Sequence, residues 1–167
     1  MEQQFPIQAE RIVYSKSGMH LTAAVRDNRR AVIDHKLYWA TAASTGESQY
    51  LCAILNAAVF TELVRPFMSH GKDERDFDKH IWQLPIPLYD PNDDLHARLA
   101  TRGGELEEAI AGLELRSVHF AAVRRDVRKF IAESEAGLDV EALVEVAELR
   151  ISIRMEALLH PGQAAPS

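Results

Sequence analysis

The stretch ESQYLCAILNAAVFTELVRP, residues 47–66, decides the fold of this chain because it predicts a long helix with a broad apolar face. Apolar side chains recur in it at helical spacing. They are Tyr50, Leu51, Ile54, Leu55, Ala58, Val59 and Leu63. Pro66 lacks the backbone N–H that a helix interior uses, so the helix is expected to end at Arg65. A helix with so broad an apolar face is expected to be buried against the rest of the protein.

Short β-strands are expected before this helix. The runs 11–14, 21–25, 31–33 and 36–41 are rich in β-branched, aromatic and other apolar residues. Turn residues separate them, with a Ser-Gly pair at 17–18 and an Asp-Asn pair at 27–28. This order predicts an antiparallel meander that packs on the central helix.

Three amphipathic helices are expected after residue 92, at 93–113, 117–135 and 139–159. Their expected N-cap residues are Asp93 or Asp94, Ser117 and Asp139. In the first helix the leucine spacing is close to that of a coiled-coil seam, which Gly103 and Gly104 interrupt. A short helical hairpin or bundle is therefore expected rather than a long zipper.

The expected fold class is α+β. An N-terminal antiparallel sheet packs on the central apolar helix, and a C-terminal helical hairpin or bundle follows. Residues 1–92 are expected to form the α+β domain and residues 93–160 the helical segment, with a frayed tail at 161–167. A chain of 167 residues is long enough to bury a core without disulfides. Its single cysteine, Cys52, is expected to be a buried, unreactive thiol.

The composition indicates a cytoplasmic protein with an uneven distribution of charge. No apolar run approaches the length of about 18 residues that spans a bilayer, and the first ten residues do not resemble a signal peptide. The net charge of −6 has the wrong sign for a protein that binds phosphates over its whole surface. Residues 1–46 nevertheless hold six Lys/Arg against four Asp/Glu, whereas residues 91–167 hold nine against fourteen. The N-terminal half therefore remains compatible with DNA.

A fixed order of three unlike pieces extends over residues 47–100. The apolar helix contains a Leu55-Asn56 pair, the charged loop SHGKDERDFDK follows at 69–79, and LPIP follows at 84–87. This order resembles the C-terminal target-recognition region of adenine-specific (N6) DNA methyltransferases of restriction–modification and phage-defence systems. It is similar, more loosely, to the specificity subunits of type I systems. The resemblance covers about residues 30–135, and it implies a module that helps to read double-stranded DNA.

Basic side chains in the charged loop and on the strand side are the candidate DNA contacts. They are Lys72, Arg75, Lys79, His80, Arg29, Arg30 and Lys36. Such residues bind phosphates, and Arg75 could also contact a guanine edge through two hydrogen bonds. The loop holds four carboxylates as well, so a self-paired, solvated loop is the alternative.

The motifs of methyl transfer are missing from the chain. There is no glycine-rich S-adenosylmethionine loop after a strand, and YDPN at 89–92 has one proline where the Asn/Asp-Pro-Pro-aromatic motif has two. The chain is therefore expected to be non-catalytic alone and to carry no cofactor. The expected partner is a catalytic methyltransferase domain or subunit, with this chain as a fragment or split subunit.

Two other functions remain open from the sequence. The acidic C-terminal helices could dock on another protein without any contact to DNA. Asp27, Asp34 and Lys36 loosely match a magnesium-dependent nuclease, but solvated residues at the start of a strand explain Asp34 and Lys36 as well. The histidine and cysteine spacings predict no metal site.

Several single residues are expected to have structural roles only. Asn56 is expected to be an amide that bonds a neighbouring loop, and both tryptophans are expected to pack. The basic stripe on the second C-terminal helix is expected to be a solvated face that pairs with Asp126 and nearby glutamates. That stripe consists of Arg124, Arg125, Arg128 and Lys129.

Overall fold

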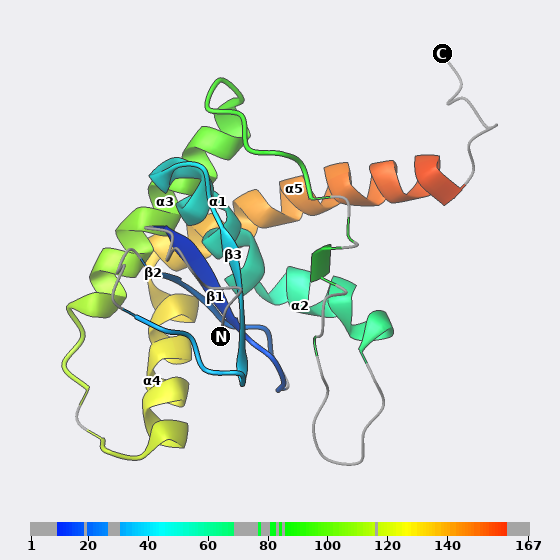
Figure 1. Cartoon of the computed structure of the whole chain (residues 1–167). Coiled ribbons are helices and arrows are strands. Elements are labelled where there is room, and N and C mark those ends of the chain that lie inside the picture. The colour runs from blue at the N-terminus through cyan, green and yellow to red at the C-terminus, as the bar shows by residue number, and fades with distance from the viewer. Residues whose placement is uncertain are drawn as a thin grey trace.

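The computed structural model describes residues 10–18, 20–26, 31–68, 77, 81–82, 84, 86–115 and 117–159. It has a three-stranded antiparallel sheet and helices that pack beside it, which confirms the predicted α+β class (Figure 1). The strands are β1 (Arg11–Ser15), β2 (Ala23–Arg26) and β3 (Leu37–Thr41). Within the described residues, no helix combines the length and the apolar character that crossing a lipid bilayer requires.

The predicted meander is wrong in its strand order. The order in the sheet is β2-β1-β3, so β3 pairs with the second edge of β1 instead of with β2. Residues 31–33, which were expected to form a strand, have no regular structure. The carbonyl of Ala31 accepts a hydrogen bond of 2.6 Å from Nη2 of Arg11, which is buried. This segment is thus held by a side chain rather than by a β-ladder.

The central helix begins as predicted but has a break that the sequence did not predict. It is divided into α1 (Thr45–Asn56) and α2 (Ala58–Val64), and a short 3-10 helix, η2 (Arg65–Phe67), contains Pro66. The break lies at Ala57, whose ψ of 142° is extended. The carboxylate of Glu141 accepts the N–H of Ala58 at 2.9 Å and thereby caps the start of α2.

Asn56, the last residue of α1, is a hydrogen-bonding amide as expected, but it is half-buried and bonds strand β2 of the sheet rather than a loop. Its Oδ1 accepts the N–H of Ala23 at 3.0 Å, and its Nδ2 donates to the Ala23 carbonyl at 2.9 Å. Sγ of Cys52 also lies 3.6 Å from that carbonyl oxygen. Burial, followed by the charge of Glu107, raises the pKa of Cys52 to about 12. The thiol is therefore protonated and unreactive at neutral pH.

The C-terminal helices are α3 (Asp94–Ala111), α4 (Phe120–Glu133) and α5 (Glu135–Leu159). Asp93 caps α3 as predicted, because its side chain accepts the N–H groups of Leu95 and His96. The predicted cap Asp139 is wrong: α5 already begins at Glu135, where Oγ of Ser134 accepts the N–H of Gly137.

Two further expectations about these helices are corrected. The predicted cap Ser117 precedes α4 by three residues and bonds the N–H of His119 instead. The two glycines of α3 do not interrupt it, and α1 packs on them: a Cβ on Gly103 would lie 2.8 Å from the carbonyl oxygen of Gln49. Glycine is needed there for close helix packing.

One hydrophobic core joins the sheet to helices from both halves of the chain. Ile12 of β1, Ile54 of α1, Leu99 of α3 and Ile151 of α5 are all fully buried members of it. The segments 1–92 and 93–160 therefore share this core. Helix α4 differs, because none of its residues is buried. The predicted tail at 161–167 lies outside the described residues.

Candidate nucleic-acid interface

Most of the candidate DNA contacts from the sequence lie outside the described residues. These are Lys72, Arg75, Lys79, His80, Arg29 and Arg30. The seventh, Lys36, is exposed in the turn before β3. Its backbone N–H donates to the side chain of Asp34 at 2.9 Å.

Described residues nevertheless fix the ends of the charged loop. Met68 before it and Ile81 after it are buried, and so is Phe77 within it. The N–H of Phe77 donates to the carbonyl of Lys16 at 2.8 Å. Lys16 follows β1 in the β1–β2 hairpin, so Phe77 is attached to the sheet at this hairpin.

Trp82, which follows the charged loop, also packs against the sheet. Its Nε1 donates to the hydroxyl of Tyr14 at 2.8 Å, and the two rings meet edge to face. Trp82 thereby connects the exit from the charged loop to the central strand of the sheet.

The turn of the β1–β2 hairpin contacts two helices. The N–H of Leu21 donates to Oγ1 of Thr61 in α2 at 3.3 Å, and Arg65 follows Thr61 by one helical turn. Gly18 has a φ of 139°, and a Cβ at this position would lie 3.5 Å from Nη2 of Arg124 in α4. The hairpin turn therefore lies between the end of α2 and the first half of α4.

Four basic residues lie near enough to this turn for their charges to interact. They are His20, Arg65, Arg124 and Arg128, here called the arginine cluster. Arg65 is paired with Glu62 on its own helix. Arg124 and Arg128 form no ion pair with any described residue. Nη2 of Arg128 is buried and has no hydrogen-bond acceptor within the described part of the chain.

The expectation of a self-paired stripe on α4 is thus half right. Arg125 pairs with Asp126 at 3.5 Å, and Lys129 pairs with Glu133 at 3.9 Å. Arg124 instead lies beside the hairpin turn, and the charge of Arg128 acts on His20 of that turn. Helical spacing alone could not distinguish the two kinds of arginine, because the distinction depends on the hairpin, which is distant in sequence.

Burial and like charges both act on the ionisable groups of the arginine cluster. Partial burial is the largest cause that lowers the pKa of His20, and the charges of the three arginines lower it further. Glu62 opposes this shift. The pKa of Arg128 is also lowered, by burial and then by the charge of Arg124. A bound phosphate would offset these repulsions.

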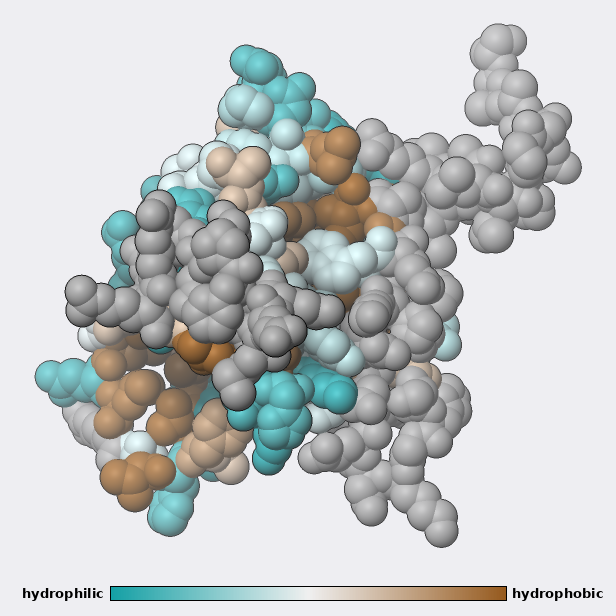
Figure 2. All heavy atoms as spheres, viewed as in Figure 1, coloured by the Kyte–Doolittle hydropathy of each residue, from teal (hydrophilic) through white to brown (hydrophobic). Residues whose placement is uncertain are grey.

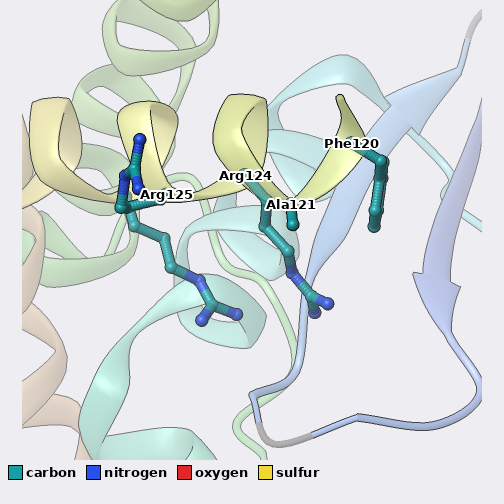
Figure 3. Close-up of a pocket in the computed structure, with 5 residues that line it drawn as sticks. Phe120, Ala121, Arg124 and Arg125 are labelled. Atoms are coloured by element: carbon teal, nitrogen blue, oxygen red, sulfur yellow. The ribbon is translucent and has the colours of Figure 1, made fainter. Parts of the chain in front are cut away.

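A shallow cavity of about 300 Å³ that is open to solvent lies along α4 (Figure 3). Phe120, Ala121, Arg124, Arg125 and Arg128 line it. Figure 3 shows the side chains of Phe120 and Arg124 extending from the same side of the helix. The Arg124 guanidinium lies 5.8 Å from the centre of the Phe120 ring.

Apolar side chains lie beside these cations. Phe120 is 77% exposed, and Leu115 and Val118 in the α3–α4 connection are 52% and 95% exposed. Figure 2 shows hydrophobic residues at the lower left, where α4 and this connection lie in Figure 1. The surface therefore offers both cations and an uncovered aromatic ring to a ligand.

The nuclease-like residues are not assembled into a site by the described residues. Asp34 is exposed, and its pKa is lowered mainly by the hydrogen bond from the N–H of Lys36. Its carboxylate also lies 3.3 Å from Nδ1 of the exposed His35. Asp27 lies outside the described residues. The expectation of solvated residues at the start of a strand is confirmed for Asp34 and Lys36.

Comparisons with protein-family models, with curated proteins and with solved structures find no match for this chain.

Proposed function

We propose that this chain is a DNA target-recognition module that binds double-stranded DNA in the cytoplasm. It would work with a separate catalytic domain or subunit of an adenine-specific DNA methyltransferase, in a restriction–modification or phage-defence system. The chain alone would not transfer methyl groups. The resemblance of residues 47–100 to such modules is the reason for proposing a methyltransferase as the partner. The basic residues of the described surface are the reason for proposing DNA as the ligand.

The arginine cluster is the observation that carries the proposal. A chain with a net charge of −6 holds three arginines and a histidine together, and two of the arginines have no carboxylate partner among the described residues. Bringing like charges together costs free energy unless an anion joins them. Phosphates of a DNA backbone are such anions, and arginine binds them through paired hydrogen bonds.

Phe77 of the charged loop is attached to the same hairpin. Phe77 bonds Lys16 on the hairpin, and the hairpin turn contacts Arg124. We propose that the loop that carries Lys72 and Arg75 acts together with the arginine cluster. The cluster would hold the backbone, and the loop would supply contacts to base edges.

The proposal is tested by DNA binding over a series of salt concentrations. Fluorescence anisotropy of a short labelled duplex would compare the wild-type chain with the double variant Arg124→Gln/Arg128→Gln. Loss of two phosphate contacts is expected to weaken binding and to reduce the slope of log K against log salt by about two units, at about 0.9 for each contact. Lys72→Ala/Arg75→Ala is expected to weaken binding as well.

Arg98→Gln is the matched control, because Arg98 is an exposed arginine on α3 outside the arginine cluster. It is expected to leave the affinity and the salt slope unchanged. The proposal is wrong if the wild-type chain does not bind duplex DNA at low salt. It is also wrong if the Arg124/Arg128 variant binds as the wild type does.

A protein-docking function is the second candidate. The exposed Leu115 and Val118 and the acidic C-terminal helices favour it. In that case assembly with another protein would persist in the Arg124/Arg128 and Lys72/Arg75 variants but would fail in Leu115→Ser/Val118→Ser. The two sets of variants therefore distinguish the candidates.

A further inference from the structure

Three residues form a row on the cavity face of α4 that turns by about 40° around the helix at each step. Phe120, Arg124 and Arg128 are spaced four apart, so each lies about 6 Å along the helix axis from the next. All three line the same cavity. The row thus presents an aromatic ring at its start and two guanidinium groups after it.

Phe120 has no role in the core that would explain its position. It is the first residue of α4, is 77% exposed and does not belong to the hydrophobic core. Its ring is near the Arg124 guanidinium, which is 5.8 Å from the ring centre. Ala121, beside it, leaves space at the cavity wall. The ring can therefore receive a flat apolar group.

An aromatic ring beside phosphate-binding cations is the arrangement that binds unpaired nucleotides. Bases stack on the ring while cations hold the backbone, and stacking does not depend on the sequence of the strand. Paired bases inside a duplex already stack on each other and offer no free face to Phe120. The cavity beside the ring is open to solvent, so an unpaired base could reach Phe120 from outside.

We infer that the α4 cavity binds one unpaired nucleotide of a DNA strand, with its base stacked on Phe120 and its flanking phosphates bound by Arg124 and Arg128. The inference rests on the proposed function, because it uses the same two arginines for the backbone. It adds a preference: DNA with an unpaired nucleotide binds more tightly than the same duplex fully paired. The Phe120 ring supplies that preference and contributes nothing to fully paired DNA.

Binding to two labelled probes tests the inference: a fully paired duplex and the same duplex with one extra, unpaired nucleotide. The wild-type chain is expected to prefer the second probe. Phe120→Leu keeps an apolar side chain but removes the stacking ring. It is expected to weaken binding to the second probe by about fivefold to a hundredfold, the range that stacking of one base provides, and to leave the paired duplex unchanged.

Two variants serve as controls for this experiment. Phe120→Tyr keeps the ring and is expected to keep the preference. Val118→Ala removes a neighbouring side chain that is 95% exposed and is expected to have no effect on either probe. A 2-aminopurine in the unpaired position would report stacking directly, through fluorescence quenching that Phe120→Leu abolishes.

The outcomes separate the inference from the proposed function. Equal binding of the two probes, or a preference that survives Phe120→Leu, overturns the inference while duplex binding still stands. Absence of binding to both probes overturns both. An equal loss on both probes in Phe120→Leu also overturns the inference, because the ring would then act on the duplex itself.

Discussion

His20 is the residue whose charge is most sensitive to an anion at the hairpin turn. Its lowered pKa means that the unfolded chain binds more protons than the folded chain in the window just below 6.5. Stability therefore rises with pH through that window and is lost as the pH falls below 6.5. Bound phosphates would shift the pKa of His20 upward. Their negative charges would offset the charges of the three arginines and favour the protonated ring.

DNA affinity is accordingly expected to rise as the pH falls through this window. The dependence is expected to reach at most about tenfold for each pH unit, the limit for uptake of one proton. It would be measured by anisotropy at fixed ionic strength above and below pH 6.5. His20→Gln should make the affinity nearly independent of pH, whereas His35→Gln, at an exposed histidine paired with Asp34, should not. A pH dependence that survives in His20→Gln would contradict this assignment.

Single residues also explain which parts of the site could be predicted from the sequence. The amide role of Asn56 and the pairing of Arg125 with Asp126 depend on local chemistry, and both were predicted correctly. The different environments of Arg124 and Arg128 were not predicted. They depend on a hairpin about one hundred residues earlier, which no spacing within α4 can indicate.

At the scale of elements, the packing of α1 on α3 depends on a close approach of the two helices. A Cβ on Gly103 would lie 2.8 Å from the Gln49 carbonyl oxygen and 3.1 Å from the Ala53 Cβ. Both atoms are on or next to the α1 backbone, which cannot move without shifting the whole helix. Gly103 is thus a packing residue in a continuous helix.

Gly103→Ala is expected to destabilise the protein. Overpacking costs about 1–3 kcal/mol, which exceeds or offsets the gain of about 1 kcal/mol in helix propensity. Urea unfolding would give the free energy difference. Gly112→Ala is the control, since a Cβ there would meet only ordinary contacts at 3.6 Å. A Gly103→Ala variant at least as stable as the Gly112→Ala control would refute the close approach.

The periodicity of the sequence predicted the helices and strands more accurately than it predicted where they break and how they pair. The apolar spacing of residues 47–65 correctly indicated a buried helix, but the break at Ala57 depends on Glu141, which caps α2 from α5. The sheet was predicted as antiparallel, but its order was wrong. The choice between pairing β3 with β2 or with β1 depends on contacts between segments rather than on the pattern within either strand.

The whole molecule depends on its last helix for its core. Val140, Leu143, Val144 and Ile151 of α5 are buried in the same cluster as β1 and α1. Burial of each such side chain stabilises a protein by about 1.5–3 kcal/mol. Together these contributions are comparable with the net stability of a typical domain, about 5–15 kcal/mol.

A chain that stops after residue 133 is therefore expected not to fold cooperatively. It would lose these side chains and also the Glu141 cap of α2. Circular dichroism with thermal melting would compare it with the full chain, and a chain that stops after residue 159 is the control. A cooperative transition in the shorter chain would show that residues 1–133 hold a core without α5.

The bond between Asn56 and Ala23 has a consequence for self-association. Ala23 belongs to β2, an outer strand of the sheet, and open outer strands can recruit strands from other molecules and begin aggregation. Asn56 occupies both the N–H and the carbonyl of Ala23, much as a neighbouring strand would. One side chain at the end of α1 thus both attaches the helix and blocks one place where a second copy of the protein could add to the sheet.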